Sequence, residues 1–112
     1  MTTREEIAAV CRAMPFVYED YPFDADWQAM RHRENDKVFA FIFGHQGGVW
    51  CNVKASPAAA QLWREVYPAV VPAYHMNKTH WVSIILDGSM ADEDIARLVQ
   101  DSYELTAKKK KR

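Results

Sequence analysis

The sequence is short of the residue patterns that support covalent or metal chemistry. Its two cysteines, Cys11 and Cys51, are too few for a disulfide scaffold, and buried thiols are the default in a reducing compartment. It contains no Cys-x-x-Cys or His-x-x-x-His spacing, and neither Gly-x-Ser-x-Gly nor Gly-x-x-x-x-Gly-Lys. These absences argue against a zinc site, a serine nucleophile and a phosphate-binding loop. We therefore expect a protein that is not an enzyme and needs no metal or other cofactor.

Long apolar runs are also missing. No stretch approaches the roughly 20 apolar residues of a membrane span, and residues 1–6 lack a cationic-then-apolar signal pattern. We therefore expect a cytoplasmic protein with no membrane partner. A length of 112 residues with 49% hydrophobic content is enough for one domain with one core, which we place at residues 1–107.

Charge is unevenly distributed along the chain. The whole chain carries a formal net charge of −1, but Lys108–Arg112 are five basic residues, so the residues before them sum to −6. Such an acidic body opposes indiscriminate binding of polyanions. Residues 31–81 are the exception, with six basic and three acidic residues and all four histidines. Nucleic-acid binding would have to use this segment and the basic tail at 108–112, which we expect to be disordered.

Three segments have helical signals. Thr3 and Glu6 form a capping-box pattern, and apolar residues then recur at helical spacing, which predicts a helix over about residues 3–14. Ser56-Pro57 is typical of a helix start, and this second helix ends before Pro68. The third helix covers about residues 91–107, with acidic residues in its first turn, as the helix dipole favours.

Five runs predict strands, at about residues 16–21, 27–33, 38–43, 49–54 and 81–86. The run at 38–43 is apolar on both alternating faces, which is typical of a central strand covered on both sides. In the run at 49–54, Trp50, Asn52 and Lys54 share one face because side chains alternate along a strand. Residues 27–54 therefore predict an antiparallel meander, and the fold class is α+β.

The segment Tyr74–Trp81 is the strongest candidate site. It concentrates aromatic rings, histidines, an amide and a lysine directly before an apolar strand. These groups can hold a planar or phosphorylated partner. The same residues are also explained if Tyr74, Met76 and Trp81 pack against the edge of the sheet, and the sequence leaves both interpretations open.

Two further groups of residues have both a functional and a structural interpretation. Trp50 beside Lys54 could stack a base or ribose, or Trp50 could pack under a helix. Glu19 and Asp20 point to opposite faces of their strand, which argues against an acid/base pair. We interpret one of them as the ion-pair partner of a cation such as Lys37 or Lys54.

Several sequence blocks together resemble the MmcQ/YjbR-like family of small bacterial proteins. The blocks are Glu19-Asp20-Tyr21-Pro22-Phe23-Asp24, Asp36-Lys37-Val38-Phe39-Ala40, Asn52-Val53-Lys54, the segment Tyr74–Trp81, Leu86-Asp87-Gly88 and Ser102-Tyr103. The resemblance covers residues 4–105 and leaves the basic tail outside. It implies a two-layer fold of the bacterial frataxin (CyaY-like) type, with helices on one face of an antiparallel sheet. It also implies a double-wing DNA-binding domain.

The main functional prediction is therefore nucleic-acid binding, with DNA as the expected partner. The two hairpin turns, at residues 34–37 and 44–48, would act as the wings. The expected phosphate contacts are Arg31, Arg33, Lys37, Lys54 and Lys78, and the expected sugar or base contacts are Asn77, His80 and Trp81. The oligomeric state is not given by the sequence, and we take a monomer as the expectation.

Two alternatives belong to other classes of function. The first is metal or protein-partner binding through an acidic ridge, formed by Glu5, Glu6, Glu19, Asp20, Asp24 and Asp26. The second is a small-molecule pocket lined by Trp50, Tyr74 and Trp81.

Overall fold

The helices begin at the signals that the sequence provides. The computed structural model describes residues 1–109. Helix α1 (Arg4–Arg12) starts with the predicted capping box, in which Thr3 and Glu6 exchange side-chain-to-backbone hydrogen bonds. Helix α2 (Pro57–Val66) is capped by the Ser56 hydroxyl. Helix α3 (Asp92–Thr106) has no side-chain cap, but its first turn carries three carboxylates that the helix dipole stabilises.

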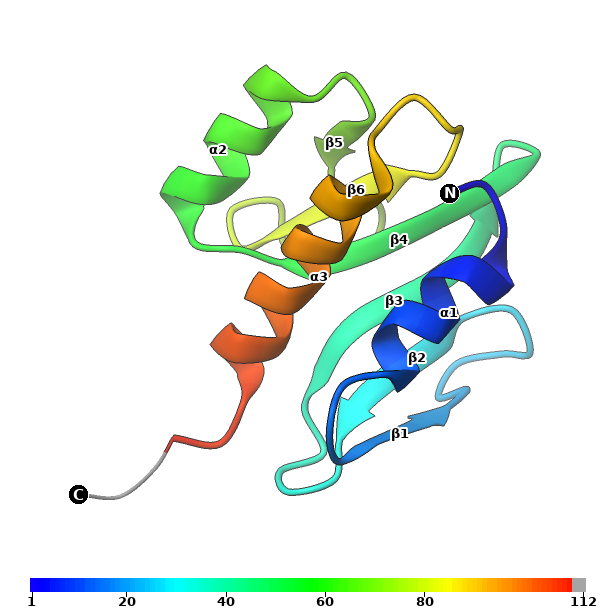
Figure 1. Ribbon diagram of the computed structural model, residues 1–112, viewed down its shortest axis with the longest axis vertical. Helices are drawn as coiled ribbons and strands as arrows, with labels where there is room; N and C mark the ends of the chain where they lie inside the picture. The colour runs from blue at the N-terminus through cyan, green and yellow to red at the C-terminus, as the bar shows by residue number, and fades with distance from the viewer. Residues whose placement is uncertain (110–112) are drawn as a thin grey trace.

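Six strands form one antiparallel sheet in the order β1-β2-β3-β4-β6-β5 (Figure 1). Their bounds are β1 Val17–Asp20, β2 Gln28–His32, β3 Val38–His45, β4 Gly48–Lys54, β5 Val70–Pro72 and β6 Trp81–Ile85. The α+β class is confirmed, and all five predicted strands are present. The five predicted runs did not include β5, which lies in a short segment after Pro68 and ends at Pro72. An edge strand tolerates Pro72 because only one of its sides needs to pair.

A β-bulge near the start of β3 departs from simple alternation. Met30 pairs with Ala40 but Arg31 pairs with Val38, so Phe39 is an extra residue. Ser102 of α3 bridges the two strands at this point. Its hydroxyl donates to the Phe39 carbonyl at 2.6 Å and accepts from the Lys54 amide at 2.8 Å. The bulge and the hydroxyl together fix the end of the sheet against α3.

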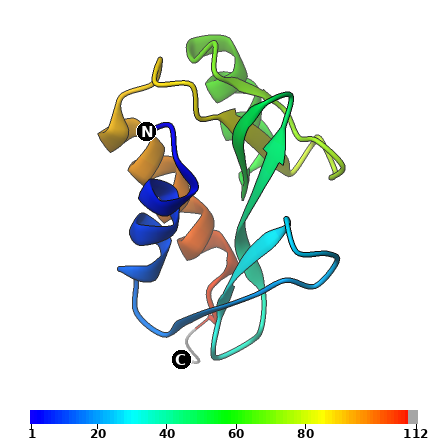
Figure 2. The ribbon, with the colours of Figure 1, turned by 90° about the vertical axis from the view of Figure 1, so that its right-hand side faces the viewer.

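The three helices lie on one face of the sheet, which forms a two-layer structure (Figure 2). Their buried residues pack with one side of the strands in a single apolar cluster. The other side of the sheet carries a second, largely aromatic cluster around Phe41, Phe43 and Trp50, to which no helix contributes. Phe41 is 6% exposed although no helix covers it. We call this second side the open face, because no helix among the described residues covers it.

The expected disordered tail at 108–112 falls mostly outside the described residues. Lys108 and Lys109 are exposed and belong to no helix or strand. Among the residues that the structure describes, no helix is long and apolar enough to cross a membrane.

Candidate functional site

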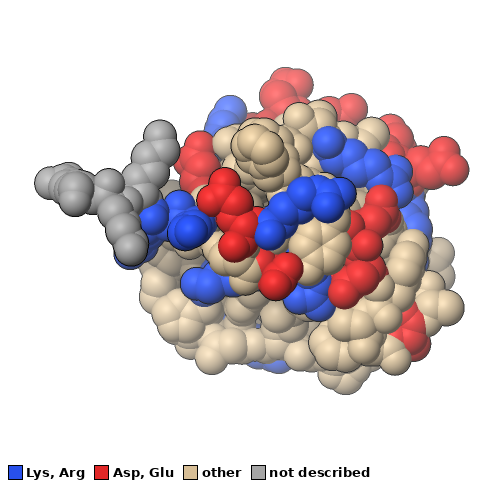
Figure 3. Space-filling view, turned by 90° about the horizontal axis from the view of Figure 1, so that it is seen from below, with Lys and Arg blue, Asp and Glu red and all other residues tan. Residues whose placement is uncertain are grey.

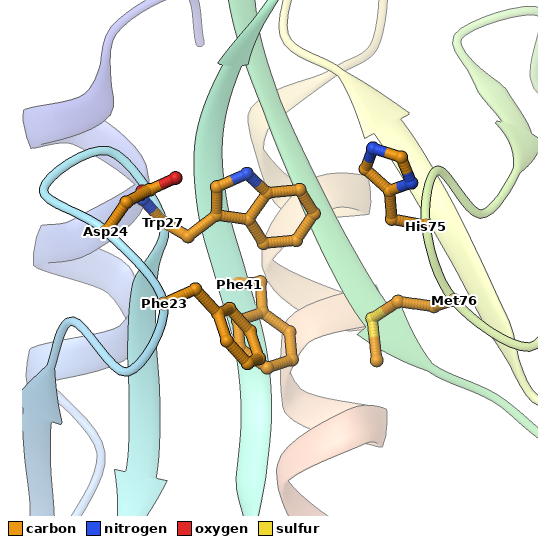
Figure 4. A pocket seen from close by; sticks show the side chains of 6 residues that line it. All are labelled: Phe23, Asp24, Trp27, Phe41, His75 and Met76. Carbon is orange, nitrogen blue, oxygen red and sulfur yellow. The ribbon is translucent and has the colours of Figure 1, made fainter.

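Two loops border a pocket on the open face of the sheet. The first loop (residues 21–27) connects β1 to β2, and the second loop (residues 73–80) connects β5 to β6. Between them lies an open pocket of about 400 Å³, lined by Phe23, Asp24, Trp27, Phe41, His75 and Met76. Figure 4 shows the first-loop residues and the second-loop residues on opposite sides of Phe41. The volume lies in the usual range of small-ligand sites.

Aromatic rings form the floor and one wall of this pocket. Phe23, Trp27 and Phe41 lie with their ring centroids 5.7–6.3 Å apart. Trp27 also stacks on Phe43 at 4.0 Å with nearly parallel planes. Phe23 is 71% exposed, so its ring is available to a ligand at little cost in desolvation. The wall therefore offers flat apolar surfaces for stacking.

Buried hydrogen bonds hold the second loop against the sheet. Asn52 and Ser83, from β4 and β6, are both fully buried. The Asn52 amide donates to the Tyr74 carbonyl at 2.9 Å, and the Tyr74 amide donates to the Ser83 hydroxyl at 2.9 Å. These hydrogen bonds provide partners for polar groups beneath the aromatic cluster, whose burial without a partner would destabilise the fold.

The ring of Tyr74 lies between two histidine rings. Its centroid is 3.9 Å from that of His45 and 3.9 Å from that of His75. His75 has a positive φ of 60°, a conformation that few non-glycine residues adopt. The turn thereby places His75 at the pocket while Tyr74 stays under it, half-buried.

Cations and rings share a row along one end of the open face. Strand pairing places Tyr18 opposite Arg31 and Arg31 opposite Val38. Lys54 lies opposite Trp81 in the β4–β6 pair. Side-chain alternation puts these residues on the open face, two positions along the strands from the row of Phe41 and Asn52. We call Tyr18, Arg31, Lys54 and Trp81 the basic row.

The structure brings some of the predicted nucleic-acid contacts together and separates others. Arg31, Lys54 and Trp81 lie in the basic row, and Asn77, Lys78 and His80 follow in the adjoining second loop. Arg33 and Lys37 lie beyond the row, in the turn between β2 and β3.

Several of the predicted contacts already have partners within the protein. Arg31 forms an ion pair with Asp20 at 2.8 Å, and Arg33 lies over the ring of Tyr18. The Asn77 side-chain oxygen accepts from the amides of Thr79 and His80, which closes a turn of the second loop. The Lys78 amine donates to the Ala73 carbonyl at 2.9 Å. Lys54 has no side-chain hydrogen bond or ion pair to any residue in the described range, so it is the cation of the row best placed to meet a ligand.

The two predicted wings do not lie side by side. The turn after β2 and the turn after β3 are at opposite ends of β3, as consecutive hairpins of a meander must be (Figure 1). Eight residues of strand separate them, which is about 26 Å at a rise of 3.3 Å per residue. The β3–β4 turn also carries no lysine or arginine. Simultaneous contact of both turns with one short stretch of duplex is therefore poorly supported.

The charged surface is mixed rather than of one sign. Figure 3 shows the end of the molecule near the C-terminus, where lysine and arginine side chains alternate with aspartate and glutamate. Three ion pairs join arginines of α1 and β2 to carboxylates of β1 and the first loop: Arg4 with Asp26, Arg12 with Glu19 and Arg31 with Asp20. The expected partners of Glu19 and Asp20, Lys37 or Lys54, are thus wrong, because arginines from α1 and β2 lie closer.

Half of the acidic ridge is neutralised by arginines, which leaves Glu5, Glu6 and Asp24 without an ion pair among the described residues. Glu19, Asp20 and Asp26 are in ion pairs, and hydrogen bonds from the Thr2 amide and from Thr3 lower the pKa of the Glu6 carboxyl group. Among the described residues, no group of three or more histidine, cysteine, aspartate or glutamate side chains is arranged to hold a metal ion.

The small-molecule pocket differs in its lining from the one predicted. Trp50, Tyr74 and Trp81 do not line it but pack in the aromatic cluster around it. The sequence interpretation missed Phe23, Asp24 and Trp27 as pocket residues, because residues 21–27 have the composition of a turn. The available signal was the presence of three aromatic residues, Tyr21, Phe23 and Trp27, within seven positions, since a turn does not require aromatic side chains.

The cysteines are unsuited to nucleophilic chemistry. Both are free and buried in the apolar cluster under the helices. Burial raises the pKa of the Cys11 thiol to about 12 and also raises that of Cys51 well above its usual value. Both thiols are therefore protonated near neutral pH.

Comparison with known proteins places the chain in a family. A family model described as YjbR matches residues 12–105. The chain belongs to the YjbR family. It is 33% identical to the uncharacterised protein YjbR of Escherichia coli K12 over 102 residues, covering 91% of this chain and 85% of that one. It is 29% identical to the uncharacterised protein YyaQ of Bacillus subtilis, covering 95% and 99% of the two chains.

Solved structures with this fold agree with the family assignment. The crystal structure of Deinococcus radiodurans protein DR2400, with a DUF419 domain, matches with a TM-score of 0.86 and 29% identity. The match covers 97% of this chain and 81% of that one. A crystal structure of a Pseudomonas syringae protein matches with a TM-score of 0.83 and 28% identity, covering 94% and 99%. YjbR-family membership thus accounts for the six-stranded sheet with three helices.

Proposed function

We propose that the open face of the sheet binds single-stranded nucleic acid, with DNA as the first candidate and without catalysis. The observation that carries this proposal is that the aromatic pocket and the basic row lie on the same open sheet face, with the ring centroid of Trp81 6.1 Å from that of Phe41. Unstacked bases would lie on Phe23, Trp27 and Phe41, and the phosphates would follow Lys54 and the second loop. Sheet faces that combine stacking rings with nearby cations are a recurrent way to bind single strands.

A single strand fits this surface better than a duplex. The pocket offers ring faces on which a base could stack, and bases in a duplex do not expose their faces. The predicted wings lie at opposite ends of β3, which gives little support to simultaneous contact of both turns with one groove. The net charge of −6 before the basic tail also disfavours the dense phosphates of a duplex.

A small aromatic molecule is the second candidate ligand, because the pocket alone has a suitable volume and ring lining. The two candidates differ in what the basic row contributes. Only a ligand with phosphates would depend on Lys54 and on the salt concentration.

The test is a titration of 12-nucleotide single strands of DNA and RNA, and of the matching duplex, followed by fluorescence anisotropy at 50 and 200 mM salt. We expect the single strands to bind more tightly than the duplex and to bind less tightly at the higher salt concentration. Equal binding of duplex and single strand would contradict the proposed mode. Absence of single-strand binding at 50 mM salt would overturn nucleic acid as the ligand and leave the small aromatic molecule.

Two matched pairs of variants locate the binding surface. Phe23→Ala and Phe16→Ala each remove an exposed phenylalanine, at 71% and 69% exposure, but only Phe23 lines the pocket. Lys54→Gln and Arg97→Gln each remove one cation, from the open face and from α3 respectively. We expect Phe23→Ala and Lys54→Gln to weaken binding and both controls to leave it unchanged. Only Lys54→Gln should lower the salt slope, by about 0.7 for one phosphate contact.

A further inference from the structure

Asp24 is the one aspartate, glutamate, lysine or arginine of the described residues that lines the aromatic pocket. Its neighbours there are Phe23, Trp27, Phe41 and Met76, which are apolar, and His75. Among the described residues, no lysine or arginine lines the pocket, so Asp24 supplies its negative charge without a neighbouring cation there. This feature is separate from the stacking surface and the basic row.

The Asp24 carboxylate is fixed in place by its own loop. Its Oδ1 accepts hydrogen bonds from the backbone amides of Asp26 and Trp27, both at 2.8 Å. Its Oδ2 accepts no hydrogen bond from any residue in the described range 1–109. The first loop therefore holds the carboxylate of Asp24, a lining residue of the pocket, with one oxygen free of hydrogen bonds from the described residues.

Asp26, two residues after Asp24, differs because both of its carboxylate oxygens have partners within the protein. Its Oδ1 forms an ion pair with Arg4 at 2.6 Å, and its Oδ2 accepts from the Gly44 amide at 3.0 Å. Both oxygens of Asp26 are thus used to attach the first loop to α1 and β3. Asp24 has no ion pair with any described residue, so its charge remains available to a ligand.

An ionised carboxylate can only accept hydrogen bonds. Among the bases, cytosine and adenine present an exocyclic amino group that donates, and guanine presents an amino group and a ring N–H. Thymine and uracil present carbonyl oxygens on both sides of their single ring N–H, and these oxygens would be repelled by the carboxylate.

We infer that the pocket selects bases that carry an exocyclic amino group over thymine and uracil, through the free oxygen of Asp24. This inference rests on the proposed function, since it names the base preference of the same surface. It makes Asp24 a specificity-determining residue, and it assigns the stacking rings no part in the preference.

The test compares 12-mers of deoxycytidine and deoxyuridine, whose bases have the same size and differ at positions 3 and 4 of the ring. At pH 7.5 we expect the parent protein to bind the cytosine strand about tenfold more tightly, the effect of one hydrogen bond to a charged group. Asp24→Asn keeps an oxygen for the two backbone amides and replaces the free oxygen with an N–H donor. We expect this variant to lose or reverse the preference.

The control is Asp101→Asn, which removes one negative charge from α3 and should leave the preference intact. Equal binding of the two strands by the parent, or an unchanged preference in Asp24→Asn, would overturn the inference while the proposed function stands. If neither strand binds at 50 mM salt, the proposed function itself is overturned, and the inference with it.

Discussion

The hydroxyl of Ser83 on β6 donates a hydrogen bond to the side-chain oxygen of Asn52 on β4, beneath the aromatic cluster of the open face. Both residues are completely buried, and both are also bonded to the backbone of Tyr74. The three residues form a closed polar group that attaches the second loop to the sheet. The position of the pocket wall therefore depends on two buried polar side chains.

The first prediction concerns this polar group. Asn52→Ala should lower the free energy of unfolding by about 1–3 kcal/mol, because the Tyr74 carbonyl and the Ser83 hydroxyl each lose a partner. The measurement is urea denaturation followed by tryptophan fluorescence. Gln61→Ala, at an exposed position of α2, is the matched control and should change stability by less than about 0.5 kcal/mol. Equal stability of the two variants would show that the loop does not depend on Asn52.

The second prediction separates core rings from ligand rings. Phe41→Ala should lower the free energy of unfolding by about 3–5 kcal/mol, since Phe41 is buried in the central strand. Phe23→Ala should cost less than about 1 kcal/mol, because its ring is mostly exposed. Thermal unfolding of both variants checks this. A melting temperature unchanged by Phe41→Ala would mean that the open face is not part of the packed core.

The regular elements could be predicted from the sequence because their signals are local. The capping box at Thr3 and Glu6, the Ser56-Pro57 start and the doubly apolar run at Val38–Phe43 each act within a few residues. The structure confirms all three. The side-chain alternation that placed Asn52 and Lys54 on one face also holds, because β4 has no bulge.

The pocket could not be predicted because it depends on contacts between distant segments. Phe23 and Trp27 precede β2, whereas His75 and Met76 precede β6, and only the strand order brings these two loops to one face. Likewise, the partner of Asp20 is Arg31 because β1 pairs with β2, a register that the sequence did not specify. Strand β5 has three residues and gains its pairing entirely from β6, so it gave no local signal.

The third prediction concerns pH. His32 is buried between the rings of Phe39 and Tyr103, and this burial lowers its pKa from the usual value of 6.5. Below pH 6.5 the unfolded chain takes up a proton at His32 more readily than the folded protein, so stability should fall as the pH decreases. The stability that the neutral form of His32 contributes is lost completely once the pH is below the pKa of His32 in the folded protein. The carboxyl groups of Glu6 and Glu19, whose pKa values are lowered from 4.5, add their own loss only at lower pH.

The measurement is the free energy of unfolding between pH 7.5 and pH 5.5, compared for the parent and for His32→Gln. The variant should show a smaller dependence on pH in this window, whatever its absolute stability. Gln61→Ala, at an exposed position of α2 and without a titratable side chain, should retain the parent's dependence. If His32→Gln keeps the full pH dependence, another group is responsible for it.

The fourth prediction distinguishes a phosphate contact by Lys78, in the second loop, from a base contact by Trp81, at the start of β6. Lys78 donates one of its three N–H groups to the Ala73 carbonyl, so two donors remain for a phosphate. Lys78→Ala should weaken binding of all single strands alike and lower the salt slope by about 0.7. Trp81, whose ring lies 6.1 Å from that of Phe41, should act differently. Trp81→Ala should weaken binding by about 1–3 kcal/mol if the ring stacks a base, with little change in the slope.

Anisotropy titrations at two salt concentrations, with melting temperatures for both variants, separate these effects. A large loss of stability in Trp81→Ala without any loss of affinity would make Trp81 a packing residue of the sheet, and unchanged affinity in Lys78→Ala would remove the second loop from the phosphate path.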